Sequence, residues 1–240
     1  MSNPFLSIII PAHNEERRLP QTLEQVVRFA ANQSFETEVL VVENASQDRT
    51  LEVGNEYASS HHGVVRVLHD DLPGKGRAVQ KGMLAALGSY RFFADADFSM
   101  PAAEIVRFIP PIVDIPVAIA SREAPGAVRY NEPNYRHITG RVFNSLIRLL
   151  VLPALHDTQC GFKLFRADAA DDLFRRQTLM GWSFDVELLY IASRRNYPIL
   201  EVPIPWYFNP ESKINVFRDS WRMFLDLLTI RRNGRLGLYD

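Results

Sequence analysis

Two carboxylates one residue apart, Asp95 and Asp97, are the side chains of this sequence best suited to chemistry. They follow a short apolar run, and the intervening Ala96 leaves both carboxylates room on one side of a turning chain. Mg²⁺ and Mn²⁺ bind one or two such carboxylates together with phosphate oxygens. A metal held in this way would neutralise a departing diphosphate. The alternative is a pair of solvated loop acids, and only the surrounding elements and motifs decide between the two.

A basic segment is the second candidate. Between residues 122 and 148 it has only two acids, Glu123 and Glu132, and a net excess of three positive charges. Three of its residues, Arg136, Gly140 and Asn144, are spaced four apart and so share one helix face. Planar guanidinium groups match phosphate geometry, which favours an anionic substrate over a solvated basic helix. The arginines are Arg122, Arg129, Arg136, Arg141 and Arg148.

Three further acids lie among apolar or aromatic residues, where a charge is costly unless it is paired. They are Asp157, Asp185 and Glu187. Any of them is a candidate general base. An acceptor that is a phosphate monoester is already an anion near neutral pH and needs no base. For such an acceptor we expect these acids to orient other groups.

The elements that must position these residues alternate between strand and helix. Alternation of this kind predicts an α/β fold, a doubly wound, mostly parallel sheet with helices on both faces. Ligands of such sheets bind beyond the carboxyl ends of the strands, where the polar loops after Ile10, Val42 and Ala94 lie. The expected strands are residues 5–10, 38–42, 64–68, 90–94, 117–121 and 199–204. The expected helices are residues 17–31, about 49 onward, a helix after the loop 73–76, and residues 135–152, 184–194 and 215–232.

Local signals refine two of these helices. Asp48 is well placed as the N-cap of the helix that starts near residue 49. Gly74-Lys75-Gly76 precedes the next helix and is either a phosphate-binding nest or a plain tight turn. The absence of repeats and linkers indicates one domain spanning residues 1–240.

Composition excludes several classes of protein. With 47% hydrophobic and 23% charged residues the chain is globular rather than disordered, and its net charge of −1 gives no basic field for nucleic acid. A single cysteine, Cys160, excludes an internal disulfide and favours a reducing compartment, here the cytoplasm. No signal peptide and no run of about 20 apolar residues is visible, so we expect a soluble or peripheral protein.

The order of several short motifs resembles glycosyltransferase family 2, whose members have the GT-A fold. Within that family the chain is similar to the dolichyl-phosphate glucosyltransferases and dolichyl-phosphate mannose synthases. The resemblance runs from about residue 5 to 232. The motifs are residues 11–16 (PAHNEE), 42–50 (VENASQDRT), 74–76 (GKG), 95–97 (DAD), 157–163 (DTQCGFK), 181–187 (GWSFDVE) and 211–214 (ESKI).

The resemblance implies roles for individual residues. It implies a nucleotide-sugar-binding half, about residues 1–100, and an acceptor-binding half, about residues 101–240. The donor would be bound by Pro11, His13, Glu15, Val42, Asn44, Asp48, Lys75, Asp95, Ala96 and Lys213. The metal, Mg²⁺ or Mn²⁺, would be bound by Asp97 with Asp95 and Ser99. The acceptor phosphate would be held by Arg122, Arg136 and Asn144, and the catalytic set would be Asp95, Asp97, Arg122 and Arg136.

The implied activity is inverting transfer of a hexose, glucose or mannose, from UDP-glucose or GDP-mannose to polyprenyl phosphate. Glu43-Asn44 replaces the usual pair of aspartates and leaves the choice between uracil and guanine open. Two alternatives remain, namely transfer to a saccharide or other hydroxyl acceptor and a non-catalytic nucleotide-sugar-binding subunit. A lipid acceptor requires a membrane surface or a membrane-anchored partner. The amphipathic residues 217–232, with Arg218 and Arg222, suit either an interfacial helix or a packed one.

Overall fold

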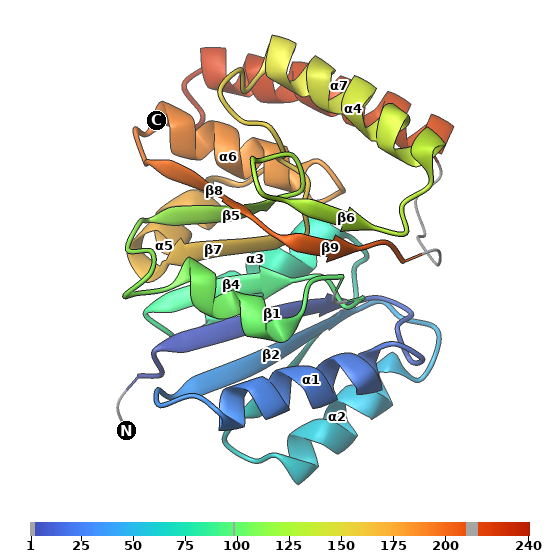
Figure 1. Cartoon of the computed structure of the whole chain (residues 1–240), viewed down its shortest axis with the longest axis vertical. Helices are drawn as coiled ribbons and strands as arrows, with labels where there is room; N and C mark the ends of the chain where they lie inside the picture. The colour runs from blue at the N-terminus through green and yellow to red at the C-terminus, as the bar shows by residue number, and fades with distance from the viewer. Residues whose placement is uncertain (1–2, 98, 210–215) are drawn as a thin grey trace.

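The computed structural model describes residues 3–97, 99–209 and 216–240, with the side chains of residues 216–220 left out. Its centre is a seven-stranded sheet with the order β3-β2-β1-β4-β7-β5-β8 (Figure 1). Neighbouring strands are parallel except at β7, which is antiparallel to both β4 and β5. The strands are β1 (Leu6–Ala12), β2 (Thr37–Asn44), β3 (Val65–Asp70), β4 (Tyr90–Ala94), β5 (Val117–Ser121), β7 (Phe162–Arg166) and β8 (Ile199–Pro203).

Helices cover both faces of the sheet because successive strand residues point to opposite sides. In β1, Ile8 and Ile10 pack into one apolar cluster with α1 (Leu19–Ala31), α2 (Thr50–Ser60) and the 3-10 helix η1 (Ala102–Phe108). Ile9, between them, packs into the other cluster. That second cluster includes α3 (Lys75–Ala85), α5 (Ala167–Arg176) and α6 (Phe184–Arg194). The predicted doubly wound, mostly parallel fold is confirmed.

Two more helices and a small ribbon complete the described chain. Helices α4 (Asn134–Leu150) and α7 (Val216–Arg235) lie side by side beyond α6 (Figure 1). Strands β6 (Val128–Tyr130) and β9 (Pro205–Tyr207) pair in parallel, separately from the main sheet. None of the helices in the described ranges is apolar over a length that would cross a bilayer.

The structure departs from the sequence prediction at the start of one helix and at five elements that the sequence does not predict, namely β6, β7, β9, η1 and α5. Strand β7 and helix α5 are not predicted, because Lys163 and Arg166 interrupt the apolar pattern of the strand. Asp48 is not at the N-cap position, since α2 begins at Thr50 and its N-cap is Arg49. Its carboxylate nevertheless accepts the first backbone N–H of α2, that of Thr50 (3.0 Å), and also the backbone N–H of Glu16 (3.2 Å). It thereby ties together the loops after β1 and β2.

Candidate active site

A cavity of about 790 Å³ lies where the sheet strands end. Pro11 in β1, Asn44 at the end of β2 and Asp95 just after β4 line it from one side. Residues of α4 and of the segment after β9 line it from the other. The predicted position of the ligand site, at the carboxyl ends of the parallel strands, is therefore a cavity in the structure.

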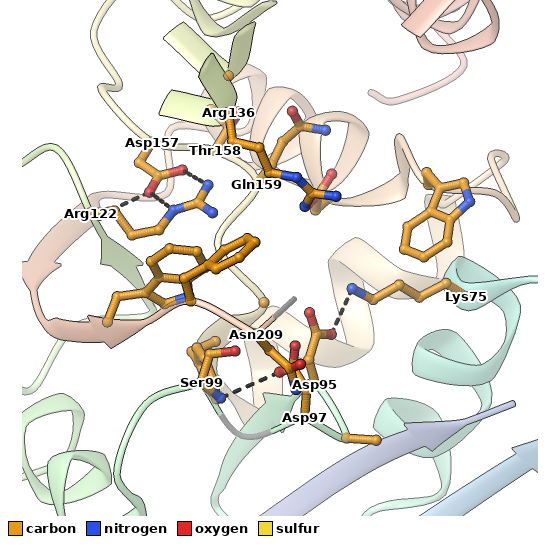
Figure 2. Close-up of a pocket in the computed structure, with 18 of the residues that line it drawn as sticks. Lys75, Asp95, Asp97, Ser99, Arg122, Arg136, Asp157, Thr158, Gln159 and Asn209 are labelled. Carbon is orange, nitrogen blue, oxygen red and sulfur yellow. Dashed lines mark hydrogen bonds and ion pairs between the residues drawn. The ribbon is translucent and has the colours of Figure 1, made fainter. Parts of the chain in front are cut away.

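Asp95 is held between the sheet and α3. Its backbone N–H donates to the carbonyl of Gly161 at 3.0 Å, and its carboxylate forms an ion pair with Lys75 at 2.6 Å (Figure 2). Burial alone would lower the pKa of Lys75, but the nearby carboxylates, Asp95 first among them, outweigh this effect and raise it. Lys75 is therefore a cation, and its ammonium group also lies 5.3 Å from the ring centre of Trp182.

Glycine places Lys75 at this position. Gly74 has a φ of 141°, and its carbonyl accepts a hydrogen bond from the side chain of Asn44 at 3.1 Å. A Cβ at Gly74 would approach the carbonyl oxygen of Met180 to 2.6 Å, so only glycine fits the turn that opens α3. The loop before α3 is thus packed tightly between β2 and the segment that precedes α6.

The Asp97 carboxylate is only partly compensated. Its burial and the neighbouring Asp95 carboxylate raise its pKa, and hydrogen bonds from Ser99 and the charge of Lys75 oppose this rise only in part. The backbone N–H of Ser99 donates to it at 3.3 Å, and it forms no ion pair with any described residue. A divalent cation would supply the missing positive charge. No group of three or more His, Cys, Asp or Glu side chains converges in the described ranges, so phosphate oxygens and water would complete the shell.

Arg122 is fixed by Asp157 on the opposite wall. Its Nε and Nη2 donate to the two carboxylate oxygens at 2.7 and 2.9 Å, and its backbone N–H donates at 2.9 Å. Burial opposes ionisation of Asp157, but the guanidinium outweighs it and lowers the pKa of Asp157 to about 2. The guanidinium also stacks on Trp206 at 5.3 Å. Arg122 therefore enters the cavity with its charge already matched.

We expect Asp157→Asn to reduce the free energy of unfolding by about 3 kcal/mol, the lower end of the range for buried pairs, because it leaves a partly exposed guanidinium without its counter-ion. The folded pKa of about 2 lies below the unfolded value of about 3.9. The contribution of the carboxylate is therefore complete above about pH 4 and is lost as the pH falls towards 2. Denaturant unfolding at several pH values measures this difference. The control Asp168→Asn, which breaks an exposed ion pair with Arg166, should change stability by less than about 1 kcal/mol. An equal effect of the two substitutions would contradict the assignment.

Arg136 differs from its neighbours on the same wall. Arg129 is paired with both Glu123 and Glu132, at 2.5 and 2.7 Å. Arg136 lines the cavity from the first turn of α4, and its guanidinium lies 5.3 Å from the ring centre of Phe208. Within the described part of the chain it forms no ion pair, so its positive charge remains available to an anion in the cavity.

The cavity brings together most of the predicted donor residues and not all of them. Val42 is fully buried beneath it, and Asp48 joins the two loops behind it. Lys213 lies outside the described residues. Those that line the cavity are Pro11, His13, Glu15, Asn44, Lys75, Asp95 and Ala96.

Of the predicted metal and acceptor residues, Ser99 and Asn144 also line the cavity. The side-chain oxygen of Asn144 is buried without a hydrogen-bond partner in the described structure. Sequence reasoning assigned no role to Thr158, Gln159, Gly161 or Phe208, which line the cavity as well. Gly161 was the available signal, because it stands in the stretch 157–163, which also contains the candidate acid Asp157.

Comparisons with known proteins agree with this geometry. The crystal structure of glucosyl-3-phosphoglycerate synthase from Mycobacterium tuberculosis with Mn²⁺, uridine diphosphate and glucosyl-3-phosphoglycerate superposes with a TM-score of 0.69. It covers 98% of this chain and 80% of that chain at 15% identity, which shows a shared GT-A fold.

Relatives at higher identity are dolichyl-phosphate beta-glucosyltransferases. The one from Drosophila melanogaster is 37% identical and covers 94% of this chain and 74% of its own length. The one from Homo sapiens is 31% identical over 98% of this chain and 77% of its own length. Residues 7–174 match the model of glycosyl transferase family 2. The chain therefore belongs to glycosyl transferase family 2 and is a hexosyltransferase.

Proposed function

We propose that this hexosyltransferase moves glucose from UDP-glucose to a polyprenyl phosphate. The observation that carries the proposal is a pair of opposite charges in one cavity, the Asp97 carboxylate and the Arg136 guanidinium, neither of which forms an ion pair with a described residue. The first suits a divalent metal on a diphosphate, and the second suits an anionic acceptor. The names of the relatives support glucose and a lipid phosphate.

On the donor side, the loops after β1 and β2 would bind the nucleotide. Pro11, His13 and Asn44 would bound the base and ribose. Mg²⁺ or Mn²⁺ on Asp97 and Asp95 would supply Lewis-acid stabilisation of the departing diphosphate. Lys75 would add a second positive group at the same place, since it already lies 2.6 Å from Asp95.

On the acceptor side, Arg136 would hold the phosphate so that one oxygen faces the anomeric carbon. The new bond forms from that oxygen while the bond to the diphosphate breaks, which inverts the anomeric configuration. A phosphate monoester is largely ionised near neutral pH, with a second pKa of about 6. The step therefore needs positioning more than it needs a base. Arg122, already paired with Asp157, would shape the wall beside it.

Donor binding and product formation test the proposal together. At 100 times its Kd, a ligand stabilises the folded state by about 2.7 kcal/mol, which raises the Tm by about 5–10 °C in a chain of this size. UDP-glucose with Mn²⁺ should give this shift and GDP-mannose should not. Incubation with polyprenyl phosphate should then release UDP and form the glucosylated lipid phosphate. A shift with GDP-mannose alone, or transfer only to a sugar hydroxyl, would contradict the proposal.

Gly161 sets the position of Asp95, which gives a sharp test of the acidic pair. A Cβ at residue 161 would overlap the carboxylate of Asp95. We expect Gly161→Ala to lower kcat/KM about tenfold by displacing that carboxylate from the diphosphate. The matched control is Gly181→Ala in another loop of the cavity, where a Cβ would meet nothing within 4 Å. An unchanged kcat/KM in Gly161→Ala would show that the reaction does not depend on the position of the Asp95 carboxylate.

We also propose that the paired helices α4 and α7 dock on the membrane that holds the lipid acceptor. Apolar side chains are exposed at helical spacing along α4 and again along α7. Exposed arginines, among them Arg148 and Arg222, flank them. The combination suits an anionic bilayer surface. The exposed apolar residues are Tyr135, Ile138, Val142 and Leu149 of α4 and Trp221, Leu225 and Leu228 of α7. A cytoplasmic location at this surface remains a prediction, as does a membrane-anchored partner.

Binding to anionic liposomes should be measurable at low salt and should weaken as salt rises, because each arginine contributes about 1 kcal/mol within a Debye length. Arg148→Glu combined with Arg222→Glu should weaken co-sedimentation further, while UDP-glucose binding stays unchanged. Arg175→Glu, an exposed charge reversal on α5, is the control and should leave sedimentation as it is. Indifference of the unmodified protein to anionic liposomes would favour an anchoring partner instead. The side chain of Arg218 lies outside the described residues.

A further inference from the structure

A buried lysine and a buried aspartate form an ion pair directly behind the cavity. Lys163 is on β7, is 0% exposed, and donates to the carbonyl of Cys160 at 2.5 Å. Its ammonium group lies 3.6 Å from the carboxylate of Asp185, in the first turn of α6. Asp185 is 6% exposed and still lines the cavity, whereas Lys163 does not. The lysine therefore serves as an internal counter-ion for a carboxylate that faces the ligand.

The position of this carboxylate along the cavity follows from strand register. Lys163 of β7 lies opposite Phe93 of β4, and Phe93 is two residues before Asp95. The backbone N–H of Asp95 bonds to Gly161 of the segment that leads into β7. Asp185 also acts electrostatically on Lys75 and on Asp95. It therefore lies next to the place where the donor diphosphate would be held.

The chemistry of Asp185 favours a neutral polar ligand over an anion. A carboxylate offers only acceptors and repels phosphate. One of its oxygens accepts the backbone N–H of Val186 at 2.8 Å. The other faces Lys163 at a separation longer than a hydrogen bond, so acceptor capacity remains for a ligand. The hydroxyl groups of a sugar are the donors that a transferred hexose presents, and a hexose bound to the diphosphate must lie within about one ring width of it.

Resting on the proposed donor, we infer that Asp185 accepts hydrogen bonds from hydroxyl groups of the transferred glucose, with Lys163 holding the carboxylate in place. Asp185 is then a specificity-determining residue, and Lys163 is a positioning residue. The pair would favour a hexose that presents hydroxyls on the side facing α6 and would discriminate against one that lacks them.

Binding of UDP, UDP-glucose and the 2-, 3-, 4- and 6-deoxy forms of UDP-glucose, measured by calorimetry with Mn²⁺ and without acceptor, tests the inference. In the unmodified protein at least one deoxy donor should bind about tenfold more weakly than UDP-glucose, the loss expected for a hydrogen bond to a charged group. In Asp185→Asn, UDP-glucose should weaken about tenfold, UDP should change less than twofold, and that deoxy donor should no longer be distinguished. Lys163→Met should act in the same direction.

Each other outcome has a definite meaning. Equal weakening of UDP and UDP-glucose in Asp185→Asn would place the residue at the nucleotide and overturn the inference. Lost transfer with unchanged UDP-glucose affinity and a shifted pH–rate profile would make Asp185 a base and also overturn it. If Asp185→Asn fails to fold, the deoxy series in the unmodified protein decides, since equal affinity for all its members is incompatible with hydroxyl recognition. Failure of UDP itself to bind would overturn the proposed donor, a result distinct from these.

Discussion

Asp97→Ala should lower the rate of glucosyl transfer by about a thousandfold while leaving the fold intact. The substitution removes a carboxylate that forms no ion pair with any described residue, and with it the expected main ligand of the metal. A metal at a departing diphosphate contributes several kcal/mol of charge stabilisation, and each 1.36 kcal/mol is a factor of about ten in rate. The measurements are kcat/KM with UDP-glucose and the Mn²⁺-dependent shift in Tm.

Asp71→Ala is the matched control for this experiment. Asp71 follows β3, its side chain is 95% exposed, and it does not line the cavity. The control should keep both its turnover and its Mn²⁺ response. Asp97→Ala should keep the unfolding temperature measured without metal, because Asp97 makes few contacts within the protein. Near-normal Mn²⁺-dependent turnover in Asp97→Ala would show that the metal is held elsewhere.

The donor side of the site could be predicted from the sequence because its residues follow strands that apolar runs mark clearly. Pro11, Asn44 and Asp95 lie at the ends of three adjacent parallel strands, so the topology alone brings them together. Val42 shows the limit of motif position. It belongs to the same motif as Asn44 and to the same face of β2, yet it lies two residues before the strand end and is fully buried under α3.

The acceptor side depends on contacts that no local pattern reveals. Arg122 and Asp157 are 35 residues apart, and their pairing leaves the arginine charge already matched. Arg129 and Arg136 cannot be told apart in the sequence. Only the folded chain shows that Arg129 is paired with two glutamates, Glu123 and Glu132. Strand β7 escapes prediction for a related reason. From the sequence alone, Lys163 is expected at the surface. In the structure it is buried, with Asp185 of α6 as its ion-pair partner.

The difference between these arginines leads to a second large effect. Arg136→Ala should raise the KM for polyprenyl phosphate by about tenfold to a hundredfold, since a hydrogen bond to a charged group contributes about 1.5–3 kcal/mol. The Kd for UDP with Mn²⁺ should change less than twofold, because the nucleotide is expected at the opposite wall. Arg136→Lys should recover part of the loss, as a point charge without the paired donors of a guanidinium.

Arg148→Ala supplies the control, because Arg148 is on the same helix, is exposed, and lies outside the cavity. Acceptor given in detergent micelles removes any contribution of Arg148 to membrane docking, so the control should then keep its KM. Equal losses in the two variants would mean that α4 attracts the lipid only through its overall charge. Equal losses of acceptor and nucleotide affinity in Arg136→Ala would instead place this guanidinium on the donor. A selective rise in the acceptor KM is the result that assigns the phosphate to the first turns of α4.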